Sequence, residues 1–213
     1  MIRLVLADDQ DLLREGLAAL LGLETDLDIV GQASTCAQTL QVVQRTRPDI
    51  LLLDVQMPPG VNGGDENVRI PQDGIEVAER MVGSGLKTRV IVLTTFGRPG
   101  YLRRTLEAGA AGFMVKDAPV ERLVDGIRRV HCGLRVLDPE LAAASLSVGI
   151  SPLSDRETTV LQETAKGGTT AAIAARLYLS EGTVRNHISS AIGKLGVINR
   201  AEAVRKALDN GWL

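Results

Sequence analysis

Aromatic side chains, cysteines and long apolar runs are all scarce in this chain of 213 residues. Phe, Trp and Tyr together make up 2 % of it. The two cysteines, Cys36 and Cys132, have neither the spacing of a metal site nor that of a disulfide framework, so we interpret both as reduced thiols. No apolar run approaches the length of a membrane span, and the first residues lack the pattern of a signal peptide. These absences predict a cytoplasmic protein that does not contact a membrane.

Net charge is small as well, because 24 Lys and Arg stand against 26 Asp and Glu. A charge of −2 excludes a chain that is a basic nucleic-acid binder over its whole length. The charge is unevenly distributed, however, since residues 152–213 carry +2 and the rest of the chain therefore −4. An acidic domain joined to a mildly basic one is typical of a regulator with a DNA-contacting module.

The stretch from Ile50 to Pro58 holds the most informative pattern. Four aliphatic residues lead directly into Asp54, as in a strand buried on both faces of a parallel sheet. Asp54 should then lie at the strand's carboxyl end, where open α/β sheets place their chemistry. Asp8 and Asp9 follow an earlier apolar run in the same way. If the two strands are neighbours, three carboxylates meet, and an all-oxygen cluster suits Mg²⁺. A simpler interpretation, in which each acid only ends a strand and faces water, stays open at this point.

Strands and helices alternate along the first 131 residues. Apolar, β-branched runs predict strands at residues 2–7, 29–33, 50–54, 89–94 and 112–115. Amphipathic periodicity predicts a helix after each of them, starting near residues 11, 36, 73, 99 and 119. This alternation predicts an α/β domain, and right-handed crossovers favour the flavodoxin-like (βα)5 fold with strand order 2-1-3-4-5. That order places the first and third strands side by side, so that both acidic strand ends face one pocket.

Residues 1–132 resemble the receiver domain of two-component response regulators. The resemblance is carried by residues that each follow or close a predicted strand: Asp8-Asp9, Asp54 with Met57-Pro58 after it, Thr94 and Lys116. It implies that Asp54 is the phospho-acceptor, a nucleophile that takes a phosphoryl group from a sensor histidine kinase. It also implies that Asp9 and Asp54 bind Mg²⁺ directly together with the backbone carbonyl of Gln56, while Asp8 acts through water.

The resemblance further implies a switch at the ends of the fourth and fifth strands. Lys116 would pair with one phosphoryl oxygen, and the Thr94 hydroxyl would donate to another. Thr95 is the competing hydroxyl if the strand register slips by one residue. As Thr94 moves, Phe113 would turn inward, so that the phosphoryl group biases two states of one domain. A solvated lysine and a plain strand-end hydroxyl stay the alternatives for Lys116 and Thr94.

One segment departs from the family, since residues 59–72 stand where receivers usually have a much shorter connection. Its Gly, Pro, Asn and Asp content is typical of a loop. A tolerated surface insertion is the simplest interpretation, because long loops cost little extra entropy. The alternative is a lid over the acidic pocket, in which Asp65 or Glu66 competes for the cation or Arg69 meets the phosphoryl group.

From Pro152 onward the pattern changes to short helices. Ser154 with Glu157 three residues later is a capping box, and further helices are expected from about residues 170, 183 and 200. The turn at Ser180-Glu181-Gly182 joins two of them as in a helix-turn-helix. We therefore predict an all-α four-helix domain at 152–213, preceded by a linker at 133–151 with a short helix opening at Asp138.

Residues 152–213 resemble the LuxR-type DNA-binding domain, so that the whole chain resembles the NarL/FixJ class of response regulators. The matching residues are Arg156-Glu157, Ile173-Ala174, Leu177, Ser180, Thr183-Val184, His187, Lys194-Leu195 and Val197. By this resemblance Arg185, Asn186 and Ser189 lie in the major groove, where Arg can read guanine and Asn adenine. Thr183 and Lys194 are expected phosphate contacts. The expected DNA-binding set is Thr183, Val184, Arg185, Asn186, Ser189 and Lys194.

The favoured hypothesis is a phosphorylation-switched transcription regulator with Mg²⁺ as cofactor, not an enzyme beyond weak self-dephosphorylation. A domain of charge +2 should bind promoter DNA weakly alone, which favours a homodimer. Its contacts are expected on the receiver and on the last helix, at Ala203, Val204, Ala207 and Leu208. One alternative is a DNA-binding regulator that ignores phosphorylation because the 59–72 loop obstructs the pocket. Another is a magnesium phosphatase resembling the haloacid dehalogenases, but these need a second acid where this chain has Gln56.

Overall fold

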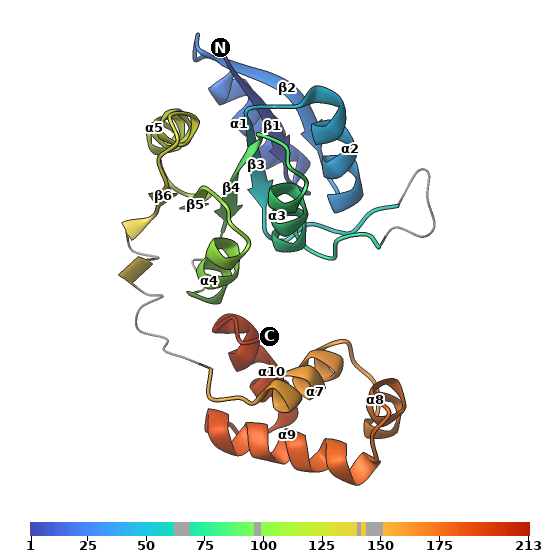
Figure 1. Ribbon diagram of the computed structural model, residues 1–213. Helices are drawn as coiled ribbons and strands as arrows, with labels where there is room; N and C mark the ends of the chain where they lie inside the picture. The colour runs from blue at the N-terminus through green and yellow to red at the C-terminus, as the bar shows by residue number, and fades with distance from the viewer. Residues whose placement is uncertain (62–68, 96–98, 140–141, 144–150) are drawn as a thin grey trace. The chain divides into compact units, whose positions relative to one another are not determined.

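The computed structural model describes residues 1–61, 69–95, 99–139, 142–143 and 151–213 (Figure 1). The chain divides into two compact units, and residues 143–213 belong to the second. Asp65 and Glu66 of the insertion lie outside the described residues, as does part of the short helix predicted from Asp138. In the described parts of the chain, no helix is both long enough and apolar enough to cross a lipid bilayer.

The N-terminal unit is built on a parallel sheet of six strands in the order β2-β1-β3-β4-β5-β6. The strands are β1 Ile2–Ala7, β2 Leu27–Ala33, β3 Ile50–Asp54, β4 Arg89–Thr94, β5 Gly112–Val115 and β6 Val136–Leu137. The predicted order 2-1-3-4-5 is confirmed. The sequence pattern does not predict β6, because two residues show no alternation and their pairing depends on the free edge of β5. Residues 136 and 137, which fall in the predicted linker, are thus part of the sheet.

The register of the central strands aligns their carboxyl ends. Ala7 of β1 pairs with Leu53 of β3, and Asp54 pairs with Leu93 of β4. Every residue of β3 is buried, as expected for a strand covered on both faces. Because the strands are parallel and in this register, the residues that follow β1 lie at the same edge as Asp54.

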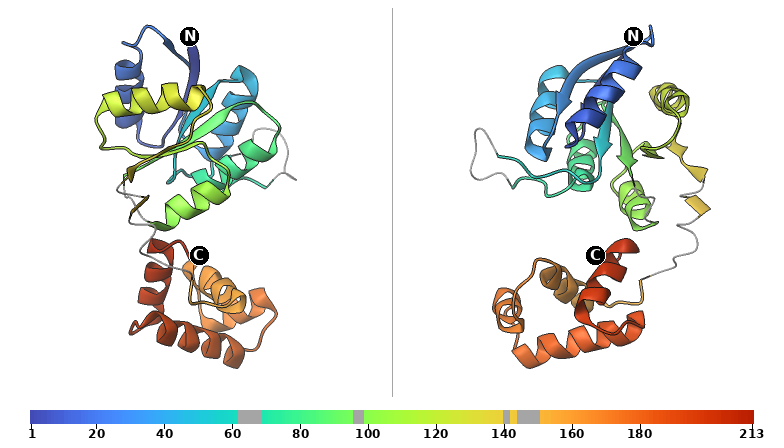
Figure 2. Two further views of the ribbon diagram at one scale, coloured as in Figure 1. Left: turned by 60° about the vertical axis from the view of Figure 1, so that its left-hand side comes forward. Right: turned by 180° about the vertical axis from the view of Figure 1, so that it is seen from behind.

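Helices cover both faces of the sheet (Figures 1 and 2). They are α1 Asp11–Leu21, α2 Cys36–Thr46, α3 Gly74–Gly83, α4 Pro99–Glu107 and α5 Val120–His131. On one face, Leu21 of α1 and Ile127 of α5 pack in one apolar cluster with Leu4 and Leu52. The alternate strand residues point to the other face, where α2 contacts β1 and α3 contacts β3 and β4. Helix α1 begins at Asp11, as expected, and Gln10 holds its cap position.

The C-terminal unit is all-α, with the four helices that the sequence predicts. They are α7 Asp155–Ala165, α8 Thr170–Leu177, α9 Glu181–Leu195 and α10 Arg200–Asp209. Each helix is capped by the side chain of the residue before it, which accepts a hydrogen bond from the backbone N–H three residues later. The capping residues are Ser154, Thr169, Ser180 and Asn199. Helix α9 begins at Glu181, two residues earlier than expected, so Glu181 and Gly182 of the predicted turn belong to its first turn.

Two small apolar clusters hold this unit together. One joins Val160, Ile173, Val184 and Ile188, and the other joins Leu161, Ala191, Leu195, Ala203 and Ala207. The expectation that Ala203 and Ala207 form a dimer surface is wrong, since both are fully buried against α9 and α7. Leu208 of the same helix is 39 % exposed, so its role as a dimer contact stays a prediction.

Candidate functional site

Three carboxylates meet at the carboxyl edge of the sheet. Ligand oxygens of Asp8, Asp9 and Asp54 all lie within 4.8 Å of one another. Asp8 and Asp54 are buried and Asp9 is exposed, so the cluster opens to solvent on one side. The structure thus brings together the acids that the strand order predicts to meet. The simpler interpretation, in which each acid separately faces water, is wrong for Asp8 and Asp54.

Lys116, the residue after β5, lies inside this cluster. Its Nζ is 2.6 Å from Oδ2 of Asp8 and 3.0 Å from Oδ2 of Asp54. The Lys116 side chain is 2 % exposed, which excludes the alternative of a solvated surface lysine. A buried ammonium that bridges two buried carboxylates neutralises part of their charge and holds Asp54 in a fixed orientation.

The cluster still has an excess of negative charge. Burial raises the pKa of Asp54, and the neighbouring Lys116 opposes this shift only in part. The backbone N–H of Gln56 also donates to the Asp54 carboxylate. With three carboxylates, one ammonium and only oxygen donors, the site fits a hard divalent cation such as Mg²⁺. The Gln56 carbonyl as a ligand stays a prediction.

Thr94 and Phe113 lie on the two strands beside Lys116. Thr94 closes β4 as predicted, is 3 % exposed, and its carbonyl accepts the Lys116 backbone N–H at 2.8 Å. Thr95 follows the strand and is exposed, so the register does not slip. The Phe113 ring is fully buried in this structure. A switch at Phe113 therefore needs a second, outward position of the ring.

The start of α3 is pressed against the phospho-acceptor candidate, a contact that sequence analysis did not find. A Cβ added to Gly74 would lie 1.8 Å from the backbone carbonyl oxygen of Asp54. The Gly74 N–H also donates to the carbonyl of Val55 at 2.9 Å. The preceding Asp73 caps α3 and accepts a hydrogen bond from Arg104 of α4 at 3.1 Å. Asp54, α3 and α4 are therefore linked through contiguous backbone and side-chain contacts.

The described ends of the 59–72 insertion contact helices α2 and α3 through hydrogen bonds and an ion pair. On the N-terminal side, the carbonyls of Pro58 and Pro59 accept the first backbone N–H groups of α2 at 2.9 and 3.0 Å. On the C-terminal side, Arg69 pairs with Glu76 of α3 at 3.2 Å. A contact of Arg69 with a phosphoryl group stays a prediction, and in this structure its guanidinium pairs with Glu76 while the side chain is 76 % exposed. Glu76 also accepts the backbone N–H of Gln72 at 3.2 Å.

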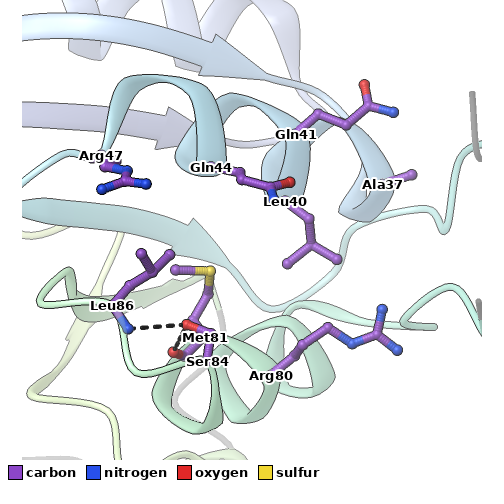
Figure 3. A pocket seen from close by; sticks show the side chains of 9 residues that line it. All are labelled: Ala37, Leu40, Gln41, Gln44, Arg47, Arg80, Met81, Ser84 and Leu86. Atoms are coloured by element: carbon purple, nitrogen blue, oxygen red, sulfur yellow. Dashed lines mark hydrogen bonds between the residues drawn. The ribbon is translucent and has the colours of Figure 1, made fainter.

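A pocket of about 420 Å³ lies between α2 and α3 (Figure 3). Leu40 of α2 and Met81 of α3 point toward one another across it, and Arg47 and Arg80 lie at its rim. Asp8, Asp9 and Asp54 do not line this pocket, so it is separate from the acidic cluster.

The predicted reading face of α9 is largely available. Arg185, Asn186 and Ser189 are exposed, and Arg185 makes an ion pair of 3.4 Å with Glu181 one turn earlier. Thr183 is half-buried, with its hydroxyl 2.8 Å from that of Ser180. The expectation that Val184 contacts DNA is wrong, because its side chain is fully buried in the core formed by α7, α8 and α9.

Lys194 is held by a buried carboxylate that sequence analysis assigned only to a capping box. Glu157 closes that box on Ser154, and its Oε2 lies 2.7 Å from Nζ of Lys194. Its Oε1 accepts the Ser190 hydroxyl at 2.7 Å. Burial would raise the pKa of Glu157, but these donors outweigh it and lower the pKa to about 2. Lys194 is therefore a weaker candidate for a phosphate contact than the sequence suggested.

Because its pKa in the folded chain lies below the ordinary value of 4.5, Glu157 stabilises the C-terminal unit most above pH 4.5. That stability should be lost as the pH falls from 4.5 towards 2. We expect Glu157→Gln to lower the free energy of unfolding by about 2 kcal/mol at pH 7 and to flatten its pH dependence below 4.5. Denaturant unfolding followed by the fluorescence of Trp212 measures both. An unchanged acid dependence in the variant would contradict this assignment.

Both units of the chain are similar to known proteins in sequence and in fold. Residues 4–128 match the family model of the response regulator receiver domain, and residues 151–207 match that of the bacterial regulatory proteins of the luxR family. The chain is 40 % identical to the uncharacterized transcriptional regulatory protein YvfU of Bacillus subtilis over 100 % of both chains. It is 39 % identical to the transcriptional regulatory protein DesR of the same organism, over 100 % of this chain and 99 % of DesR. The crystal structure of the response regulator ChrA, 31 % identical, superposes over 100 % of this chain and 98 % of ChrA with a TM-score of 0.57.

Proposed function

Because the chain belongs to the LuxR/NarL-type response regulators of two-component systems, which are DNA-binding transcription regulators and not enzymes, we propose that a phosphoryl group on Asp54 switches its binding to promoter DNA. The donor would be the phosphohistidine of a cognate sensor kinase in the cytoplasm. The observation that carries the proposal is the buried Asp54 carboxylate, fixed by Lys116 beside two further acids.

The residues at the sheet edge divide the work of phosphoryl transfer. A carboxylate oxygen of Asp54 would form the O–P bond as the P–N bond of the phosphohistidine breaks and the imidazole leaves. Asp9 and Asp54 would hold Mg²⁺ with the carbonyl of Gln56, while Asp8 acts through water. When bound, the cation supplies positive charge that offsets the charge on the phosphoryl oxygens. Lys116 already lies 3.0 Å from Asp54 and would pair with one of these oxygens.

The response would pass through the adjacent strand ends. Thr94 is buried beside Lys116 and would donate its hydroxyl to a phosphoryl oxygen. As Thr94 moves toward the phosphoryl group, the Phe113 ring would occupy the inward position that it has in this structure. The phosphoryl group can shift this equilibrium only by the difference between its contacts in the two states.

DNA binding would be carried by the exposed face of α9. Arg185, Asn186 and Ser189 present a guanidinium, an amide and a hydroxyl, groups that read base edges in the major groove. A unit of charge +2 neutralises few phosphates, so two copies on one site would supply the missing affinity. We therefore propose that the chain acts as a homodimer on DNA.

The test of the proposal is phosphoryl uptake from acetyl phosphate, measured by intact mass. We expect one phosphoryl group per chain with Mg²⁺, and uptake slowed at least about tenfold by a chelator. A variant in which a short Gly-Ser linker replaces residues 62–68 should take up phosphoryl at a similar rate, since both described ends of the insertion are fastened to α2 and α3. Uptake that occurs only in the shortened variant would favour the obstructed pocket and a regulator that ignores phosphorylation.

A further inference from the structure

The turn between α8 and α9 carries a side chain that the fold does not use. Tyr178 follows the last residue of α8, and Ser180 caps α9 two residues later. Its two neighbours, Leu177 and Leu179, pack against the apolar core of the unit. Tyr178 itself is 96 % exposed, and no hydrogen bond to its hydroxyl is found among the residues that the structure describes.

The backbone at this position favours glycine instead of tyrosine. Tyr178 has φ 55° and ψ 41°, the left-handed conformation in which a Cβ is unfavourable. Along the described chain, every other residue with a positive φ is a glycine except Arg47. Glycine ends α9 at Gly196 in the same conformation. Neither the backbone nor the core therefore explains a tyrosine at 178, which points to a role outside the folded chain.

The place of the turn indicates what the ring would contact. It lies at the N-terminal end of α9, the helix whose exposed face carries Arg185 and Asn186. The positive end of a helix dipole favours anions, and a DNA duplex that offers its major groove to α9 brings phosphates to that end. A tyrosine provides an apolar ring for the deoxyribose and a hydroxyl donor for a phosphate oxygen.

We propose that Tyr178 is a DNA-backbone contact, its hydroxyl donating to a phosphodiester oxygen beside the groove that α9 reads. The contact positions the helix and does not specify sequence. It suits a unit of low positive charge, because it adds affinity without adding a cation. The inference rests on the DNA-binding family of this unit and is independent of phosphorylation at Asp54.

A neutral contact has a distinctive salt dependence. Loss of a Lys or Arg contact reduces the slope of log K against log salt by about one, because one fewer counterion is released. Loss of the Tyr178 hydroxyl should lower affinity equally at every salt concentration and leave that slope unchanged. This readout separates a direct contact from a change in the charge of the domain.

The experiment uses the full chain and a fluorescein-labelled duplex of about 30 base pairs of arbitrary sequence, since a backbone contact needs no operator. Anisotropy titrations at several salt concentrations should show Kd raised about two- to tenfold by Tyr178→Phe and at least as much by Tyr178→Gly, with unchanged slopes. Tyr178→Gly should also melt no lower than the unsubstituted chain, because the left-handed conformation favours glycine. Arg47→Gly, the same change at the other left-handed site, should leave Kd unchanged.

Three results would overturn the proposal. The first is a Kd for Tyr178→Gly within about twofold of the unsubstituted chain. The second is a loss of affinity accompanied by a lower melting temperature, which would assign the residue to folding. The third is an absence of binding by the unsubstituted chain even after phosphorylation with Mg²⁺ and acetyl phosphate, which would also contradict DNA binding by the α9 face. The first two results leave the proposed phosphorylation switch intact.

Discussion

Asp54→Ala is expected to abolish phosphoryl uptake from acetyl phosphate, a loss of more than about a hundredfold, because it removes the carboxylate oxygen that would attack the phosphorus atom. Asp54 is buried, receives the backbone N–H of Gln56 and lies 3.0 Å from the Lys116 ammonium. The variant should still fold, because Lys116 keeps its ion pair with Asp8 at 2.6 Å and no buried charge is left alone. Intact mass after incubation with Mg²⁺ and acetyl phosphate measures the result.

The matched control is Asp28→Asn, which removes an exposed carboxylate from β2, away from the carboxyl edge. It should take up phosphoryl at the unsubstituted rate. If Asp54→Ala still gains one phosphoryl group per chain, another residue is the acceptor and the assignment of Asp54 is wrong.

Gly74→Ala is expected to destabilise the N-terminal unit by about 3–5 kcal/mol, because the structure has no room for the added methyl group. The added Cβ would lie 1.8 Å from the carbonyl oxygen of Asp54, and that oxygen belongs to β3, a central strand paired with β1 on one side and β4 on the other. Either α3 or the end of β3 must move. Differential scanning calorimetry should show the melting transition of this unit lowered by roughly 10 °C or more.

The same helix supplies the control. An added Cβ at Gly83, the last residue of α3, meets no atom within 4 Å, and its φ is not positive. Gly83→Ala should therefore be neutral or stabilise the unit by up to about 1 kcal/mol, since alanine favours helix. Equal melting temperatures for the two variants would show that the Gly74 contact with Asp54 is not close.

The central strands were predictable because their signal is local. Ile50 to Leu53 form an uninterrupted apolar run that ends in an acid, and the run before Asp8 has the same form. Such runs occur in parallel strands covered on both faces, and the right-handed crossover rule then leaves few strand orders. The meeting of Asp8, Asp9 and Asp54 follows from that order alone.

What the sequence did not show depends on distant partners. β6 exists only because Val136 and Leu137 find the free edge of β5. The close approach of Gly74 to Asp54 is a backbone contact between residues twenty positions apart, and no residue pattern encodes it. The sequence also does not decide between Thr169 and Thr170 as the cap of α8, because both are good caps and only the turn geometry selects Thr169.

The DNA-binding face shows the same limit. Val184 shares the turn of α9 with Thr183 and Arg185, and a helical pattern alone cannot separate a core residue from a groove residue when the helix is mostly polar. Lys194 looked free because its partner, Glu157, lies on α7, 37 residues away. Glu157 in turn looked like a capping residue and nothing more.

The most direct test of the account is the affinity of one preparation for its own promoter DNA before and after phosphorylation with Mg²⁺ and acetyl phosphate. A phosphoryl group on Asp54 should lower the Kd by about tenfold or more, within the usual range of coupling between two sites, and Asp54→Ala should show no change. Equal affinities for the phosphorylated and unphosphorylated chain, with one phosphoryl group confirmed by mass, would contradict the switch.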